Sequence, residues 1–139
     1  MCTDYLRCTP KFFGKPRYDC VLVQTVHKCI FARILFIFAI KLGSSYHAIV
    51  LIQPYDSYLG PRRRKDEELG LFRVGAKPNS EFIPLRSIIR GALLVQDFDE
   101  EKSGEFIVVD VIDGDMFFRI KEMSGKFQSC LVGEVFVVN

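Results

Sequence analysis

The sequence has no tryptophan and lacks the cysteine and histidine spacing of a metal site. Its 139 residues include five cysteines and two histidines, but no two cysteines have the C-x-x-C spacing by which short loops hold zinc ligands in pairs. An odd number of cysteines without a secretory signal indicates reduced thiols. We therefore expect an intracellular protein with no bound metal and no cofactor.

Catalytic motifs are also missing. The chain has neither a glycine-rich phosphate loop nor a G-x-S-x-G nucleophile motif. Carboxylates gather at residues 97–101 and again at Asp110, Asp113 and Asp115, and a two-metal nuclease needs such groups to converge on its ions. The Asp113-Gly114-Asp115 sequence is more typical of a turn. We expect a protein that is not an enzyme, and a metal-dependent nuclease is the least favoured alternative.

The longest hydrophobic segment, residues 30–52, is interrupted by Arg33, Lys41 and His47. A membrane-spanning helix needs about 20 mostly apolar residues without charges at mid-span. The Gly43-Ser44-Ser45 sequence within the segment is typical of a hairpin turn. The segment therefore predicts two strands and no transmembrane helix, and the first ten residues show no secretory peptide.

Short apolar runs rich in Val, Ile and Phe, separated by Gly, Ser, Asn, Asp and Pro, recur along the chain. This pattern predicts strands, whereas helical periods are few. We expect a mainly β protein, a small barrel-like module with short helical turns. The predicted strands are Tyr18–Thr25, Ile30–Ala39, His47–Gln53, Leu71–Val74, Ile88–Val95, Glu105–Val111 and Met116–Lys121.

Charge is divided unevenly between the two halves of the chain. Residues 1–65 hold 11 Lys and Arg against 3 Asp and Glu, whereas residues 66–139 hold 8 against 14. Basic residues mixed with aromatic ones are typical of nucleic-acid binding, because cations contact phosphates and rings stack on bases. Alternatively, Phe12 and Phe13 pack into the core, and the second basic run pairs with the acids at 66–68. The predicted nucleic-acid-binding residues are Lys11, Lys15, Arg17, Arg62, Arg63, Arg64 and Lys65.

One long segment, RVGAKPNSEFIPLRSIIRGALLVQDFDEEKSGEFIVVDVIDGDMFFR at residues 73–119, resembles the C-terminal region of Plavaka-type transposases of basidiomycete fungi, relatives of the Kyakuja-Dileera-Zisupton elements. The resemblance extends upstream through RYDCVLVQT, FARILFIF, QPYD and KDEELGLFRV. It implies a non-catalytic module or remnant, accessory to nucleic-acid binding or structural, and nuclear if it functions. Its boundaries imply an extension at 1–12, a module at 13–123 and a tail at 124–139.

A second resemblance rests on shorter motifs in a particular order. Ala32-Arg33, Pro54-Tyr55, Glu81-Phe82, Ser87-Ile88 and Gly91 together look like a bromo-adjacent homology domain. This resemblance implies a barrel of that type, or of SH3 or Tudor type, that reads a chromatin or histone peptide. Such a reader needs an aromatic pocket for a methylated lysine. The residues predicted to supply the pocket are Tyr46, Tyr55, Tyr58 and Phe72.

Overall fold

Strands make up almost all of the regular structure in the computed structural model, which describes residues 4–56, 71–96, 104–109, 120 and 135–137. The predicted mainly β class is confirmed, and a short helical turn, η1, spans Leu85–Ser87. The strands are β1 (Asp4–Leu6), β2 (Cys8–Phe12), β3 (Lys15–Tyr18), β4 (Cys20–Gln24), β5 (Cys29–Leu42), β6 (Ser45–Asp56), β7 (Phe72–Ala76), β8 (Glu81–Pro84), β9 (Ile88–Ala92), β10 (Leu94–Gln96), β11 (Glu105–Val108) and β12 (Val135–Val137).

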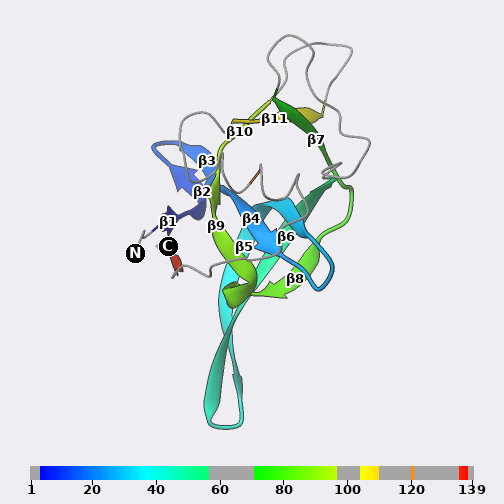
Figure 1. Cartoon of the computed structure of the whole chain (residues 1–139). Coiled ribbons are helices and arrows are strands. Elements are labelled where there is room, and N and C mark those ends of the chain that lie inside the picture. The colour runs from blue at the N-terminus through cyan, green and yellow to red at the C-terminus, as the bar shows by residue number, and fades with distance from the viewer. Residues whose placement is uncertain (1–3, 57–70, 97–103, 110–119, 121–134, 138–139) are drawn as a thin grey trace.

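The main sheet is antiparallel and has the strand order β10-β11-β7-β6-β5-β4-β9, and β8 pairs with a separate stretch of β6, residues Ile49–Ile52 (Figure 1). Among the described strands no pairing joins β10 to β9, so the sheet is not a closed barrel. These two end strands are nevertheless consecutive in the chain, and only Leu93 separates them. The chain therefore links the two ends of the sheet covalently.

The longest hydrophobic segment forms the β5–β6 hairpin, whose outer end projects from the sheet as an arm (Figure 1). The turn falls at Gly43 and Ser44, between the paired residues Leu42 and Ser45. Gly43 has a φ of +62°, which glycine adopts without the steric cost of a Cβ atom. The predicted turn is therefore confirmed. In the described part of the chain, no helix has the length and apolar character needed to cross a membrane.

Apolar side chains are buried on both faces of the central strands. In β4, Val21 and Val23 belong to one core cluster, whereas Leu22 between them belongs to another. In β5, Ile34 lies in the first cluster and Phe31 in the second. Successive side chains of a strand point to opposite faces. Cover on both faces explains why these strands read as continuous apolar runs rather than as alternating ones.

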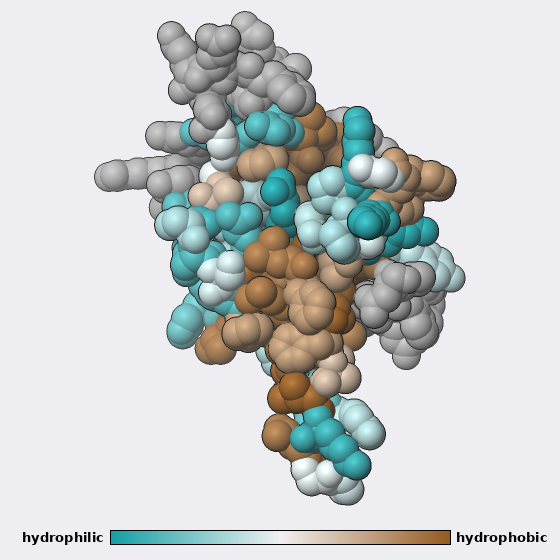
Figure 2. Space-filling view, turned by 180° about the vertical axis from the view of Figure 1, so that it is seen from behind, coloured by the Kyte–Doolittle hydropathy of each residue, from teal (hydrophilic) through white to brown (hydrophobic). Residues whose placement is uncertain are grey.

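On the arm, one face of the sheet stays exposed. Phe36 is 59% exposed and Phe82 on β8 is 67% exposed, and Phe38 contacts both rings at centroid distances of 5.8 and 6.0 Å. Figure 2 shows an apolar surface extending from the sheet onto the arm. The register places Ile40 and Leu42 on the same face as Phe36. This apolar face carries no Lys or Arg among the described residues that form it.

The N-terminal strands belong to the folded part of the chain. β1 pairs in parallel with β12, so segments from the two ends of the chain lie side by side (Figure 1). Leu6 is buried in the first core cluster. The expected boundary between residues 12 and 13 falls within the turn of the β2–β3 hairpin. Residues 4–12 therefore include the strands β1 and β2, and β12 lies within the expected tail.

Candidate nucleic-acid interface

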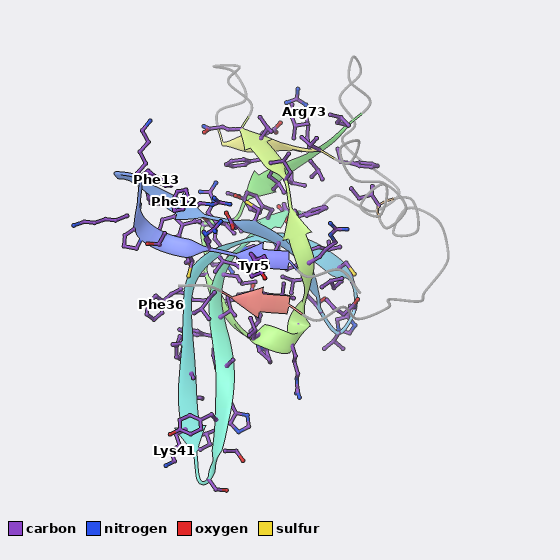
Figure 3. The ribbon with its side chains drawn as sticks, turned by 90° about the vertical axis from the view of Figure 1, so that its left-hand side faces the viewer. Tyr5, Phe12, Phe13, Phe36, Lys41 and Arg73 are labelled. Carbon is purple, nitrogen blue, oxygen red and sulfur yellow. The ribbon has the colours of Figure 1, made fainter. Side chains whose placement is uncertain are left out.

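The β2–β3 hairpin presents an aromatic ring at its tip. Its turn consists of Phe13 and Gly14, with φ angles of +48° and +82°. Positive φ at both central residues matches the twist of a tight hairpin, but a residue with a side chain pays about 1–2 kcal/mol for it. Phe13 is 94% exposed, and Figure 3 places it at the end of the hairpin. The tip therefore holds a large apolar side chain in water at a cost in backbone energy.

Phe12 supports the tip from the hairpin itself. Its ring contacts Phe13 edge to face at a centroid distance of 4.7 Å. The guanidinium carbons of Arg7 and Arg17 lie 5.4 and 4.9 Å from the Phe12 centroid, within the range of cation–π attraction. The alternative in which both phenylalanines pack into the core is wrong for Phe13 and does not hold for Phe12, which is half-buried in this cationic setting.

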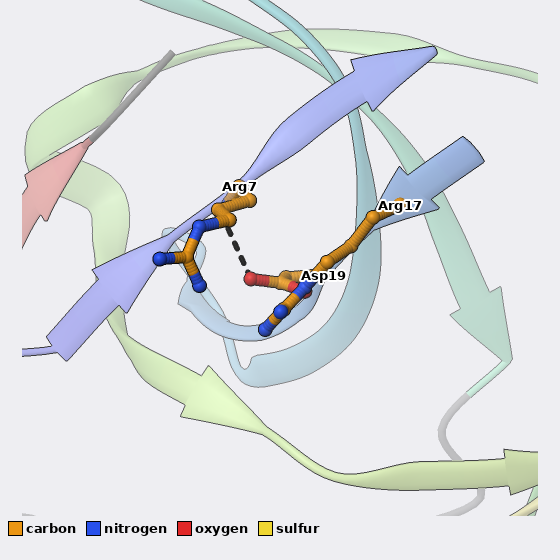
Figure 4. Close-up of polar contacts among 3 residues, drawn as sticks. All are labelled: Arg7, Arg17 and Asp19. Carbon is orange, nitrogen blue, oxygen red and sulfur yellow. Dashed lines mark hydrogen bonds and ion pairs between the residues drawn. The ribbon is translucent and has the colours of Figure 1, made fainter. Parts of the chain in front are cut away.

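Asp19 fixes the base of the hairpin. One carboxylate oxygen accepts the backbone N–H of Arg7 at 2.8 Å, and the other accepts Nε–H of Arg17 at 2.9 Å. The backbone N–H of Asp19 in turn donates to the carbonyl of Arg7 at 2.9 Å. Figure 4 shows how the three residues converge. Hydrogen bonds to a charged group are stronger than neutral ones, so Asp19 holds the Arg17 guanidinium in place beside the Phe12 ring.

The hairpin carries more positive charge than Asp19 offsets. Lys11 and Lys15 are exposed, and neither ammonium group forms an ion pair with any residue in the described part of the chain. Together with Arg7 and Arg17 they give four cations against the one carboxylate of Asp19. The structure therefore brings three predicted nucleic-acid-binding residues, Lys11, Lys15 and Arg17, onto one hairpin.

A groove of about 440 Å³ lies beside the base of this hairpin, between it and the β9–β10 segment. Two cationic side chains, Arg17 and Arg90, and the acid Asp19 line it. The rings of Tyr5, which is 63% exposed, and Tyr18 also contribute to its wall. Nε–H of Arg90 donates to the Gly91 carbonyl at 3.3 Å, which orients the side chain along β9. We call the hairpin and this groove together the basic-aromatic surface.

Sequence reasoning missed three residues of the basic-aromatic surface. Arg7 and Tyr5 fall in the segment that was expected to be an extension, and Arg90 is distant in sequence from the hairpin. Tyr18 ends the run of basic and aromatic residues that indicated this surface in the sequence, whereas nothing local indicated that β9 lies beside β4.

The other predicted nucleic-acid-binding residues, Arg62, Arg63, Arg64 and Lys65, lie outside the described residues, as does Tyr58 of the predicted aromatic pocket. The described members of that pocket do not come together. Tyr55 and Phe72 are buried in the second core cluster, and burial raises the pKa of the Tyr55 phenol. Tyr46 lies near the opposite end of β6, which at about 3.3 Å per residue is roughly 30 Å away.

A second hollow, of about 230 Å³, contains charges of both signs. Lys77 lies 3.3 Å from Asp56, and Arg73, labelled in Figure 3, lies 3.6 Å from Glu105. Each cation here has a carboxylate beside it. This hollow is therefore compensated within the protein and offers less positive potential to a phosphate than the hairpin does.

In the described part of the chain, no three His, Cys, Asp or Glu residues lie close enough together to hold a metal ion. Burial raises the pKa of the Cys8 and Cys20 thiols, which keeps them protonated at neutral pH and weak as nucleophiles. The carboxylates at 97–101, Asp110, Asp113 and Asp115 lie outside the described residues.

Comparison of the chain with protein-family models, with curated proteins and with solved structures finds no match.

Proposed function

We propose that this protein is a non-catalytic module that binds nucleic acid through the β2–β3 hairpin. The observation that carries the proposal is the grouping of Lys11, Lys15 and Arg17 on the β2–β3 hairpin, with Arg7 directly before β2 and Asp19 as the acid that pairs with Arg17. Cations of this kind neutralise backbone phosphates whatever the base sequence. Binding is therefore sequence-independent and weakens steeply with salt.

The resemblance to the C-terminal region of Plavaka-type transposases gives this activity a context. We propose that the module, or its remnant, is accessory to a transposase and nuclear. The finer architecture we propose is a barrel-like fold of bromo-adjacent, SH3 or Tudor type. Its support is that β9 and β10, at the two ends of the sheet order, are separated in the chain only by Leu93.

Reading of a methylated chromatin peptide is the alternative function. It needs aromatic rings that converge on a cation. The separation of Tyr46 from the buried Tyr55 and Phe72 disfavours it relative to nucleic-acid binding. A reader would prefer a methylated peptide over DNA and respond little to salt.

Replacing both hairpin lysines, Lys11→Gln with Lys15→Gln, should lower the salt dependence of DNA binding. Each phosphate contact contributes about 0.9 to the slope of log K against log salt for duplex DNA. Loss of two contacts therefore reduces the slope by roughly 1.8. Fluorescence anisotropy over a series of salt concentrations measures it.

The matched control is Lys28→Gln with Lys41→Gln, because both lysines are exposed and lie away from the hairpin. This pair removes the same net charge. An equal fall in slope for the control would show that binding follows net charge alone and would contradict a hairpin site.

We also expect the protein to have no nuclease activity. Incubated with magnesium or manganese, the purified protein should leave plasmid DNA intact on a gel, because no motif of the sequence arranges carboxylates for two-metal chemistry. Cleavage that is abolished in Asp110→Asn would overturn the non-catalytic assignment, since a contaminating nuclease would not respond to that change.

A further inference from the structure

The basic-aromatic surface combines cations with exposed aromatic rings, and binding to duplex DNA requires only the cations. Its cations suit any phosphate backbone, but its rings are useful only to a ligand with an accessible flat face. We infer that the surface takes single-stranded nucleic acid in preference to duplex, an inference that rests on the proposed nucleic-acid function and deepens it.

The groove supplies the first part of the argument. Its volume of about 440 Å³ falls in the range of roughly 300–1,000 Å³ that is typical of pockets for small ligands, and a base is a ligand of this kind once it is unpaired. Tyr5 and Tyr18 offer ring surface at the wall, while Arg17 and Arg90 supply positive charge. In a duplex the base faces are covered by their neighbours, so these rings would have no partner there.

The hairpin tip supplies the second part. Phe13 stands almost fully exposed in a left-handed backbone conformation, with Lys11 and Lys15 exposed on the strands on either side of the turn. β3 extends from Lys15 to Tyr18, so the tip and the groove are about 10 Å apart along the strand. A single strand that stacks one base on Phe13 and another in the groove keeps its phosphates beside the lysines and Arg17.

An anionic membrane is the other ligand that attracts a phenylalanine flanked by lysines. The groove distinguishes a single strand of nucleic acid from a membrane as the ligand. Tyr5 and Tyr18 line the groove together with the charged groups of Arg17 and Arg90, an arrangement that suits a separate flat ring with a phosphate attached. The apolar face of the arm, which lies on other strands, carries no cation and does not extend the basic-aromatic surface. The combined features therefore favour an unpaired strand.

The test uses the full chain and two probes of equal length, an oligothymidine and a DNA duplex, each measured by anisotropy at low and at physiological salt. We expect the oligothymidine to bind about tenfold more tightly or better. Phe13→Leu and Tyr18→Leu should each weaken oligothymidine binding by about tenfold, because base stacking on a ring is lost, and should weaken duplex binding much less. Both rings lie outside the core clusters, so folding, checked by circular dichroism, should persist.

The matched control is Tyr46→Leu, an exposed tyrosine on the arm, which should change neither affinity. Equal binding of both probes, with no effect of Phe13→Leu or Tyr18→Leu but a loss in the double lysine variant, would overturn the single-strand inference and leave the proposed function standing. Binding of neither probe would overturn both. Capture by vesicles containing phosphatidylserine, without binding to either probe, would also overturn both and assign the tip to a membrane.

Discussion

Ile34→Asp should unfold the protein. Ile34 is fully buried on β5 in the middle of the main sheet, where it pairs with Ile52. A carboxylate placed there lies among the apolar side chains of the first core cluster. Burying an unpaired charge costs several kcal/mol, which is comparable to the total of about 5–15 kcal/mol that stabilises a typical domain. Urea denaturation followed by circular dichroism should show no folded baseline.

Leu42→Asp is the matched control for this change. It introduces the same side chain on the same strand, but at the outer end of the arm, where Leu42 is exposed. A carboxylate there stays in water, so the midpoint of unfolding should change little. A folded Ile34→Asp variant, or one no less stable than Leu42→Asp, would contradict the placement of the core.

The main strands could be predicted from the sequence because strands such as β5, which are buried on both faces, form continuous apolar runs. Runs such as CVLVQ in β4 contain several β-branched residues and few polar ones, and they predict strands whatever covers them. The turn at Gly43 is equally local. These features are properties of short segments, and for that reason the main strands and the β5–β6 hairpin could be predicted.

The order of the strands in the sheet is not a local property. The run at β11 is as apolar as those of the central strands, but β11 lies second from one end of the sheet order, and Ile107 is half-buried. The neighbours that cover a strand come from distant parts of the chain. Ile34 and Phe31, rather than Ile107, lie where the sheet is buried most deeply.

The candidate site also depends on contacts between parts of the chain that are distant in sequence, so the sequence predicted only part of it. Lys11, Lys15 and Arg17 are close in sequence, so their grouping on one surface could be expected. The β2–β3 hairpin itself was missed, because its strands, CTPKF and KPRY, contain prolines and charges that disfavour strands. What holds it is Asp19, an isolated acid in a basic stretch, which bonds to a backbone group twelve residues away.

The described residues of the predicted aromatic pocket lie apart for a geometric reason. Tyr46 and Tyr55 lie on one strand, and an extended strand separates its residues by about 3.3 Å each. Only a chain that folds back between them could have brought the rings together, but both belong to the continuous strand β6. Aromatic composition alone therefore does not show whether two rings form a pocket together or whether one lies in the core and the other is exposed.

Asp19→Ala should affect folding and nucleic-acid binding in opposite directions. The change removes the acceptor for the Arg7 N–H and for Arg17 Nε–H. Hydrogen bonds to a charged group contribute about 1.5–3 kcal/mol, so we expect the free energy of unfolding to fall by roughly 2–3 kcal/mol. Asp19→Asn should lower the free energy of unfolding by a smaller amount, because the amide oxygen of Asn still accepts the Arg7 N–H. Chemical denaturation measures both.

The same change should strengthen nucleic-acid binding by the molecules that remain folded. Asp19 is the acid that lines the groove with Arg17 and Arg90, so its removal takes one negative charge from the groove, and the attraction to phosphate grows with it. Measured at a temperature where the variant is still folded, the affinity for oligothymidine at low salt should rise, and the gain should shrink as salt is added. A stability loss with an equal loss of affinity would instead mean that the Arg17 guanidinium must be held by Asp19 in order to bind, and the site would then depend on the position of Arg17 more than on net charge.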